Sequence, residues 1–177
     1  MPFKNFVDGA RLDDTDLNRY FLQQAHVIKS VDESVTSSIV MQDDNELFLA
    51  LLANTQYWFE CFIFYGANAT ADIRIDFTVP AGTTYDFTHS GLRLGHSTAD
   101  GIDNVARSRF TEGSTFGTIG GINATTNAEI GVIPVEGRIS TAGTAGNIRL
   151  QFCQDTSNAT STVVKANSVM IIQRLTV

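Results

Sequence analysis

The spacing of apolar residues changes near Ser34, and this change constrains the fold more than any other feature of the chain. Before it, over residues 13–29, apolar side chains recur every three or four positions, as they do on one face of an α-helix. After it, apolar and polar residues alternate, which is typical of a half-buried β-strand. The sequence therefore predicts a short helix over residues 13–29, followed by an all-β body.

The alternation in the β body is clearest in residues 73–79 and 148–152, and weaker alternation predicts further strands at 129–135 and 137–140. Clusters of Gly, Thr, Asn and Ser separate these segments. Short strands separated by turns at regular intervals are typical of antiparallel sandwiches and jelly rolls. We therefore predict an all-β fold built as an antiparallel β-sandwich, jelly-roll-like, with a short N-terminal helical anchor.

The anchor is predicted to span residues 1–33, and the β-sandwich domain residues 34–177. A helix of this length is marginally stable by itself, so its apolar face must pack against something else. We expect it to attach the protein to a larger assembly, while packing across one end of the sandwich remains the alternative. The expected contact residues are Phe3, Phe6, Val7, Leu12, Leu17, Tyr20, Phe21 and Ile28.

Residues 57–65 are apolar at nearly every position, and so are residues 47–52. A strand with one face in the core needs apolar residues only at alternate positions, so the second face must also be covered. We expect a second copy of the chain to cover it, which predicts a homo-oligomer. The expected interface residues are Tyr57, Trp58, Phe62 and Phe64. An alternative role for Trp58 and its neighbours is an aromatic platform for a sugar.

Charge and composition exclude several classes of protein. The formal net charge is −7, and the 12 Lys and Arg residues are scattered, so no groove for nucleic acid is expected. No apolar run approaches the ~20 residues that span a bilayer, and no secretory signal is present. We expect folding in a cytoplasm, with Cys61 and Cys153 as reduced thiols. Cys61 is expected in the core, and Cys153 is expected to face away from it.

No arrangement of polar residues predicts catalysis or metal binding. The three histidines, His26, His89 and His96, have no cysteine or further histidine nearby at the spacing of a metal site. No motif positions a nucleophile, and Ser114 is interpreted as an ordinary loop residue. The acidic stretches 43–46 and 100–104 are interpreted as solvated turns rather than Ca²⁺ sites. We expect a non-enzyme with no catalytic residue, metal or cofactor.

Several stretches resemble structural proteins of tailed bacteriophages. In residues 6–20, FVDGARLDDTDLNRY, an aromatic residue, a glycine and a leucine precede a capped helix that carries Asp-Leu-Asn and then Tyr. This order is similar to an N-terminal pattern of phage virion proteins. Residues 150–160, LQFCQDTSNAT, resemble small structural proteins of phages that infect actinobacteria, as do residues 32–38 and 42–47. Residues 90–131 show no such resemblance.

The resemblance implies a non-enzymatic minor structural protein of the virion, such as a head-fibre, decoration or minor tail protein. It implies a homotrimer that contacts other virion proteins of the capsid or tail, and a location in the virion after synthesis in the cytoplasm of the host bacterium. In this interpretation the N-terminal segment docks to the particle and the β domain is displayed outward. The alternative function is a receptor-binding module that recognises a bacterial surface glycan. Neither nucleic acid nor a membrane is expected as a partner.

Overall fold

The computed structural model describes residues 23–92, 105–111, 117–122, 127–128 and 130–175. These residues form twelve strands and no helix, and every strand pair between them is antiparallel. The predicted all-β class is therefore confirmed.

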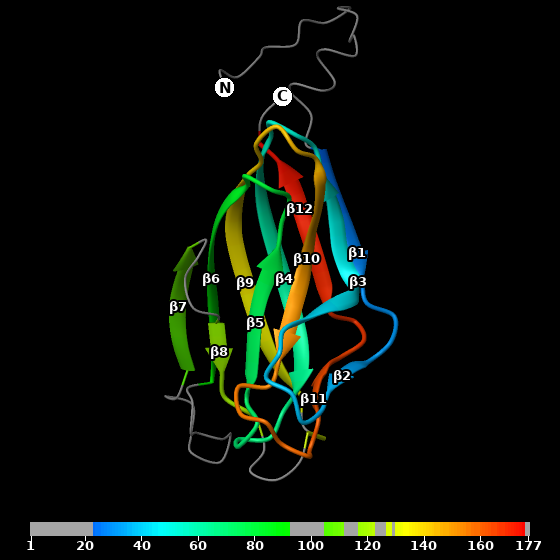
Figure 1. The fold of residues 1–177 in the computed structure, drawn as a ribbon, viewed down its shortest axis with the longest axis vertical. Coiled ribbons are helices and arrows are strands. Elements are labelled where there is room, and N and C mark those ends of the chain that lie inside the picture. Colours follow the sequence, from blue (N-terminus) through cyan, green and yellow to red (C-terminus); the bar gives the residue numbers. More distant parts are fainter. Residues whose placement is uncertain (1–22, 93–104, 112–116, 123–126, 129, 176–177) are drawn as a thin grey trace, which may run out of the picture.

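Two sheets make up the fold (Figure 1). The large sheet has the strand order β1 (Gln23–Ile28), β12 (Val169–Arg174), β4 (Gln56–Gly66), β9 (Gly131–Ser140), β6 (Thr84–Leu92) and β7 (Val105–Thr111). Two short strands complete it, with β11 (Thr162–Val164) beside β4 and β2 (Glu33–Val35) beside β11. The small sheet has the order β3 (Gln42–Leu51), β10 (Gly146–Cys153), β5 (Ile73–Thr78) and β8 (Gly117–Ile119).

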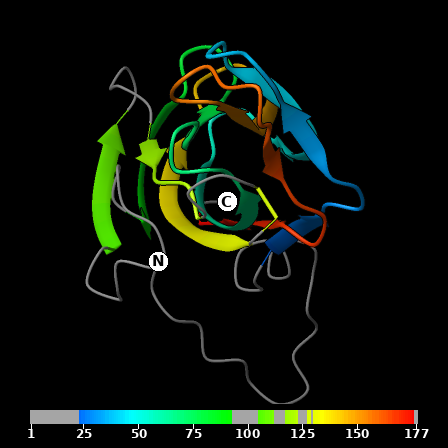
Figure 2. The same cartoon turned by 90° about the horizontal axis from the view of Figure 1, so that it is seen from below.

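The hydrophobic core lies between the two sheets. Figure 1 shows the small sheet in front of the large one, and Figure 2 shows the strands arranged around a common interior. Alternate residues of each strand fill this interior, because successive side chains of a strand point to opposite faces. The buried core includes Leu47, Ile75, Ile148 and Leu150 from the small sheet, and Phe59, Ile63, Ile133 and Met170 from the large sheet.

The predicted helix over residues 13–29 is wrong from Gln23 onward. Residues 23–28 form strand β1, which pairs with β12 from Gln23 opposite Arg174 to Ile28 opposite Val169. Helical spacing is a weak preference that tertiary pairing overrides, and here β1 satisfies the backbone edge of β12. The remainder of the predicted helix, residues 13–22, lies outside the described residues. The described part of the large sheet thus begins at Gln23 and includes part of the segment expected to be the anchor.

A buried ion cluster joins the β1–β2 connection to strand β3 of the opposite sheet. The fully buried Lys29 ammonium lies 2.8 Å from a carboxylate oxygen of Asp44, which is also fully buried. Its Nζ lies 3.0 Å from Glu33 and 3.8 Å from Glu46. The backbone N–H groups of Glu46 and Leu47 donate to the Asp44 carboxylate at 2.9 and 2.8 Å. Residues 43–46 are therefore part of a strand, and the interpretation of this stretch as a solvated turn is wrong.

Replacing Lys29 with methionine should destabilise the protein strongly. The variant leaves the buried Asp44 carboxylate without its cation, and breaking a buried pair in this way costs about 3–5 kcal/mol of the free energy of unfolding. The matched control is Lys165→Met, which removes an ammonium 3.0 Å from the half-exposed Asp32. Such a surface pair contributes at most about 1 kcal/mol. Urea denaturation of the two variants measures the difference, and equal losses would contradict the assignment.

Candidate functional site

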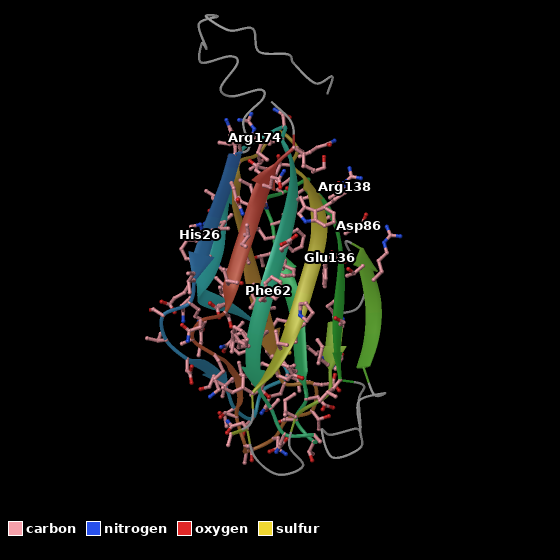
Figure 3. The ribbon with its side chains drawn as sticks, turned by 180° about the vertical axis from the view of Figure 1, so that it is seen from behind. His26, Phe62, Asp86, Glu136, Arg138 and Arg174 are labelled. Atoms are coloured by element: carbon pink, nitrogen blue, oxygen red, sulfur yellow. The ribbon has the colours of Figure 1, made fainter. Side chains whose placement is uncertain are left out.

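The outer face of the large sheet carries the residues that best fit a functional surface (Figure 3). Residues directly opposite one another on paired strands share a face, so the strand register gives the rows that cross this surface. One row joins Gln173 of β12 to Trp58 of β4, Arg138 of β9 and Asp86 of β6. The next joins Glu60 to Glu136 and Thr88. The face is thus assembled from strands far apart in sequence.

One half of this face is an apolar strip. It consists of Ile28, Val169, Phe62 and Pro134 in one row, with Phe64 and Val132 in the row beside it. Three of these side chains are strongly exposed: Ile28 is 58 % exposed, Phe62 43 % and Val132 47 %. Large apolar side chains gathered on one surface, rather than scattered singly, indicate a contact surface.

The other half of the face is a polar groove with a volume of ≈ 290 Å³. Its side chains are Trp58, Asp86, Thr88, Arg109, Glu136 and Arg138, from strands β4, β6, β7 and β9. A second hollow of ≈ 260 Å³ adjoins it, because Thr88 and Glu136 line both. Glu60, Phe62 and Pro134 line the far side of that hollow, which therefore reaches the apolar strip.

Contacts within the groove fix the orientation of several side chains. The Trp58 indole N–H donates to Glu60 at 3.1 Å, and the Thr88 hydroxyl donates to Glu136 at 3.3 Å. At the edge of the sheet, the Arg109 guanidinium lies 3.2 Å from the Asp86 carboxylate. The groove therefore presents an oriented aromatic ring beside both donors and acceptors.

The carboxylates of Glu60 and Glu136 come from directly opposite positions on β4 and β9. Like charges at opposite positions destabilise a sheet, so this pairing is costly for the fold alone. Arg138 is exposed one row away, opposite both Trp58 and Asp86. With the residues that the structure describes, its guanidinium makes no hydrogen bond or ion pair. Figure 3 shows Arg138 and Asp86 near one end of the face, with Glu136 below them.

His89 lines the adjoining hollow but not the groove itself. Its side chain points to the core side of β6, where its ring centroid lies 6.4 Å from that of Phe87 and it is 4 % exposed. Burial lowers the pKa of His89 to about 4, so the imidazole is neutral at neutral pH. His26 is exposed on β1, and His96 lies outside the described residues. The structure therefore does not bring His26 and His89 together.

The residues expected at an oligomer interface divide between the two faces of β4. Trp58, Phe62 and Phe64 point outward, which accounts for the unbroken apolar pattern of this segment. Tyr57 instead lies in the core with 4 % of its surface exposed, and its hydroxyl accepts a hydrogen bond from the Leu52 N–H at 2.8 Å. Ile28 is exposed on the apolar strip. The other expected anchor residues, Phe3, Phe6, Val7, Leu12, Leu17, Tyr20 and Phe21, lie outside the described residues.

Cys61 and Cys153 are both buried free thiols. Cys61 belongs to the core cluster, whereas Cys153 is fully buried outside it, on the opposite side of β10 from Phe152. Burial raises the pKa of both thiols, which keeps them protonated and poorly reactive.

Within the described ranges, no group of three or more His, Cys, Asp or Glu side chains is placed to hold a metal ion. No helix in this part of the chain is suited to crossing a membrane. Comparison with protein-family models, with curated proteins and with solved structures finds no match for the chain.

Sequence reasoning did not identify most of the groove. Asp86, Thr88, Glu136 and Arg138 occupy the polar positions of alternating strands, where solvated side chains are ordinary. Nothing in their local spacing indicates that they share one surface. Trp58 was the only available signal, as the one tryptophan of the chain in an otherwise apolar segment.

Replacing His89 with glutamine should reduce the acid sensitivity of the protein. The unfolded chain takes up a proton at this position below pH ~6.5, whereas the folded chain does so only near pH 4. Stability is therefore lost as the pH falls through this window, by up to about 3 kcal/mol. Urea denaturation between pH 7 and pH 4 should show a shallower loss in His89→Gln than in the wild type. An unchanged slope in His89→Gln would contradict the effect of burial on this imidazole.

Proposed function

We propose that this protein is a non-enzymatic structural module of a tailed-phage virion, docked through its N-terminal segment and displayed outward as a homotrimer. The observation that carries the proposal is the apolar strip on the outer face of the large sheet. The resemblance of residues 6–20, 32–38, 42–47 and 150–160 to phage structural proteins supplies the biological setting and the trimer.

The strand order supports a jelly-roll-like sandwich. The β1-β12-β4-β9 order of one sheet faces the β3-β10-β5-β8 order of the other. The chain also crosses between sheets at most connections, for example from β3 to β4 and from β4 to β5. Jelly rolls of this kind are used by viral capsid and lectin domains. A fold alone does not determine function, so this likeness supports the setting and not the activity.

A second copy of the chain is the partner that best fits the apolar strip. The strip crosses β1, β12, β4 and β9, so it is a feature of the rigid sheet rather than of a loop. Burying several large apolar side chains on each subunit supplies several kcal/mol, at about 25 cal/mol per Å². In a closed ring every subunit makes the same contacts, so this stabilisation is repeated at each interface.

Replacing Phe62 with glutamate should dissociate the oligomer. The variant places a charge at the middle of the apolar strip, where subunit contact would bury it without a partner. The matched control is Phe48→Glu on β3 of the small sheet, where Phe48 is 37 % exposed. Light scattering at micromolar concentration should show a trimer for the wild type and the control, and a monomer for Phe62→Glu. A monomeric wild type would contradict the proposal.

Deleting residues 1–22 tests the anchor and keeps all twelve described strands in the chain. A longer deletion would remove β1 and Lys29, both of which belong to the folded body. We expect the truncated protein to keep the urea denaturation midpoint of the full chain but to be absent from purified phage particles. Incorporation of the truncated protein at the normal level would contradict a docking role. A large loss of stability would instead show that these residues pack on the sandwich.

A further inference from the structure

We infer that the polar groove on the outer face of the large sheet is a binding site for a neutral saccharide. The site consists of Trp58, Asp86, Thr88, Arg109, Glu136 and Arg138. This inference goes beyond the structural role proposed above, and it does not depend on the oligomeric state of the protein.

The aromatic side of the site is set by Trp58. Its indole N–H is held by Glu60 at 3.1 Å, so the ring is oriented before any ligand arrives. A sugar ring has one face covered by C–H groups, and such an apolar face packs on an aromatic ring. Trp58 is half-buried on the outer side of β4 and lines the groove, so part of its ring is exposed for this contact.

The polar side of the site provides both donors and acceptors in a small space. Arg138 offers guanidinium donors, and Glu136, two positions away on the same face of β9, offers carboxylate acceptors. Asp86 and Arg109 form an ion pair at the rim and add one group of each kind. A sugar hydroxyl donates one hydrogen bond and accepts others, so it needs this mixture. Hydrogen bonds to charged groups are also the strong ones.

The charge of the site selects a neutral sugar over other ligands. The carboxylates of Glu60, Glu136 and Asp86 outnumber the two guanidinium groups on this part of the face, and the whole chain carries −7. A polyanion such as a nucleic acid or an acidic polymer would therefore be repelled. The volume of the groove, ≈ 290 Å³, lies near the lower end of small-molecule sites and suits a single sugar ring.

The single tryptophan of the chain gives a direct test, because all indole fluorescence reports on Trp58. The full-length protein is titrated with the methyl glycosides of glucose, galactose, mannose, N-acetylglucosamine and N-acetylgalactosamine. We expect at least one to change the fluorescence saturably, with a dissociation constant of about 1 mM, as for a ligand of this size. The absence of a saturable change with all five glycosides would overturn the inference.

Matched variants locate the site. Arg138→Ala keeps the fluorescent reporter and should weaken binding about tenfold, the value of one charged hydrogen bond. The control is Arg149→Ala on β10 of the small sheet, which should leave the affinity unchanged. Urea denaturation verifies that both variants fold. Trp58→Ala, followed by calorimetry, should abolish binding. Equal weakening by Arg138→Ala and Arg149→Ala would overturn the location.

Together, the oligomeric state and the glycoside titration distinguish a failure of this inference from a failure of the proposed structural role. A trimer that binds none of the glycosides overturns the saccharide site alone. A monomer that binds one of them supports the site and overturns only the trimer.

Discussion

The position of strand β4 in the large sheet determines how both faces of that sheet are built. It is hydrogen bonded to β12 on one side and to β9 on the other, along most of its eleven residues. Its inward residues Phe59, Cys61 and Ile63 fill the core, and its outward residues include Trp58 and Phe62. Because the side-chain period of a strand is two, a shift of one residue in its pairing would exchange these two sets. Core and outer surface are therefore fixed by the same register.

The ion cluster around Lys29 explains how an edge strand is held in this arrangement. β1 lies at the edge of the large sheet and buries few of its own side chains. Lys29 follows it directly, and its ammonium reaches Asp44 on the small sheet, while its backbone N–H donates to Ser168 at 2.8 Å. Burial lowers the pKa of Lys29, but hydrogen bonds to Asp44 and Glu33 outweigh this effect and the net pKa is raised. The charged form is thus favoured in the folded state, and the pair ties one sheet to the other.

These features show which parts of the fold the sequence could predict. Strands such as β5 and β10 follow from alternation alone, because each has one buried face. β1 was missed because its few apolar residues fit a helix as well as an edge strand, and only its pairing with β12 decides between them. The strand break predicted near residue 136 is absent, since β9 continues through Gly137. Gly137 faces the ring of Phe59, where a Cβ would lie 2.4 Å from the ring.

The groove could not be predicted from the sequence, because Glu60 lies opposite Glu136 only through the pairing register of β4 and β9.

The two proposed roles use different parts of the outer face of one rigid sheet. The apolar strip lies across β1, β12, β4 and β9, whereas the polar groove extends from Trp58 on β4 over β9 to β6 and β7. Subunits that associate through the strip would therefore leave the β6–β7 side of the groove open to solvent. Sites built on strands hold their side chains more precisely than sites on loops. An oligomer of this kind would present several identical grooves, and binding through several weak sites raises the overall affinity without any new contact.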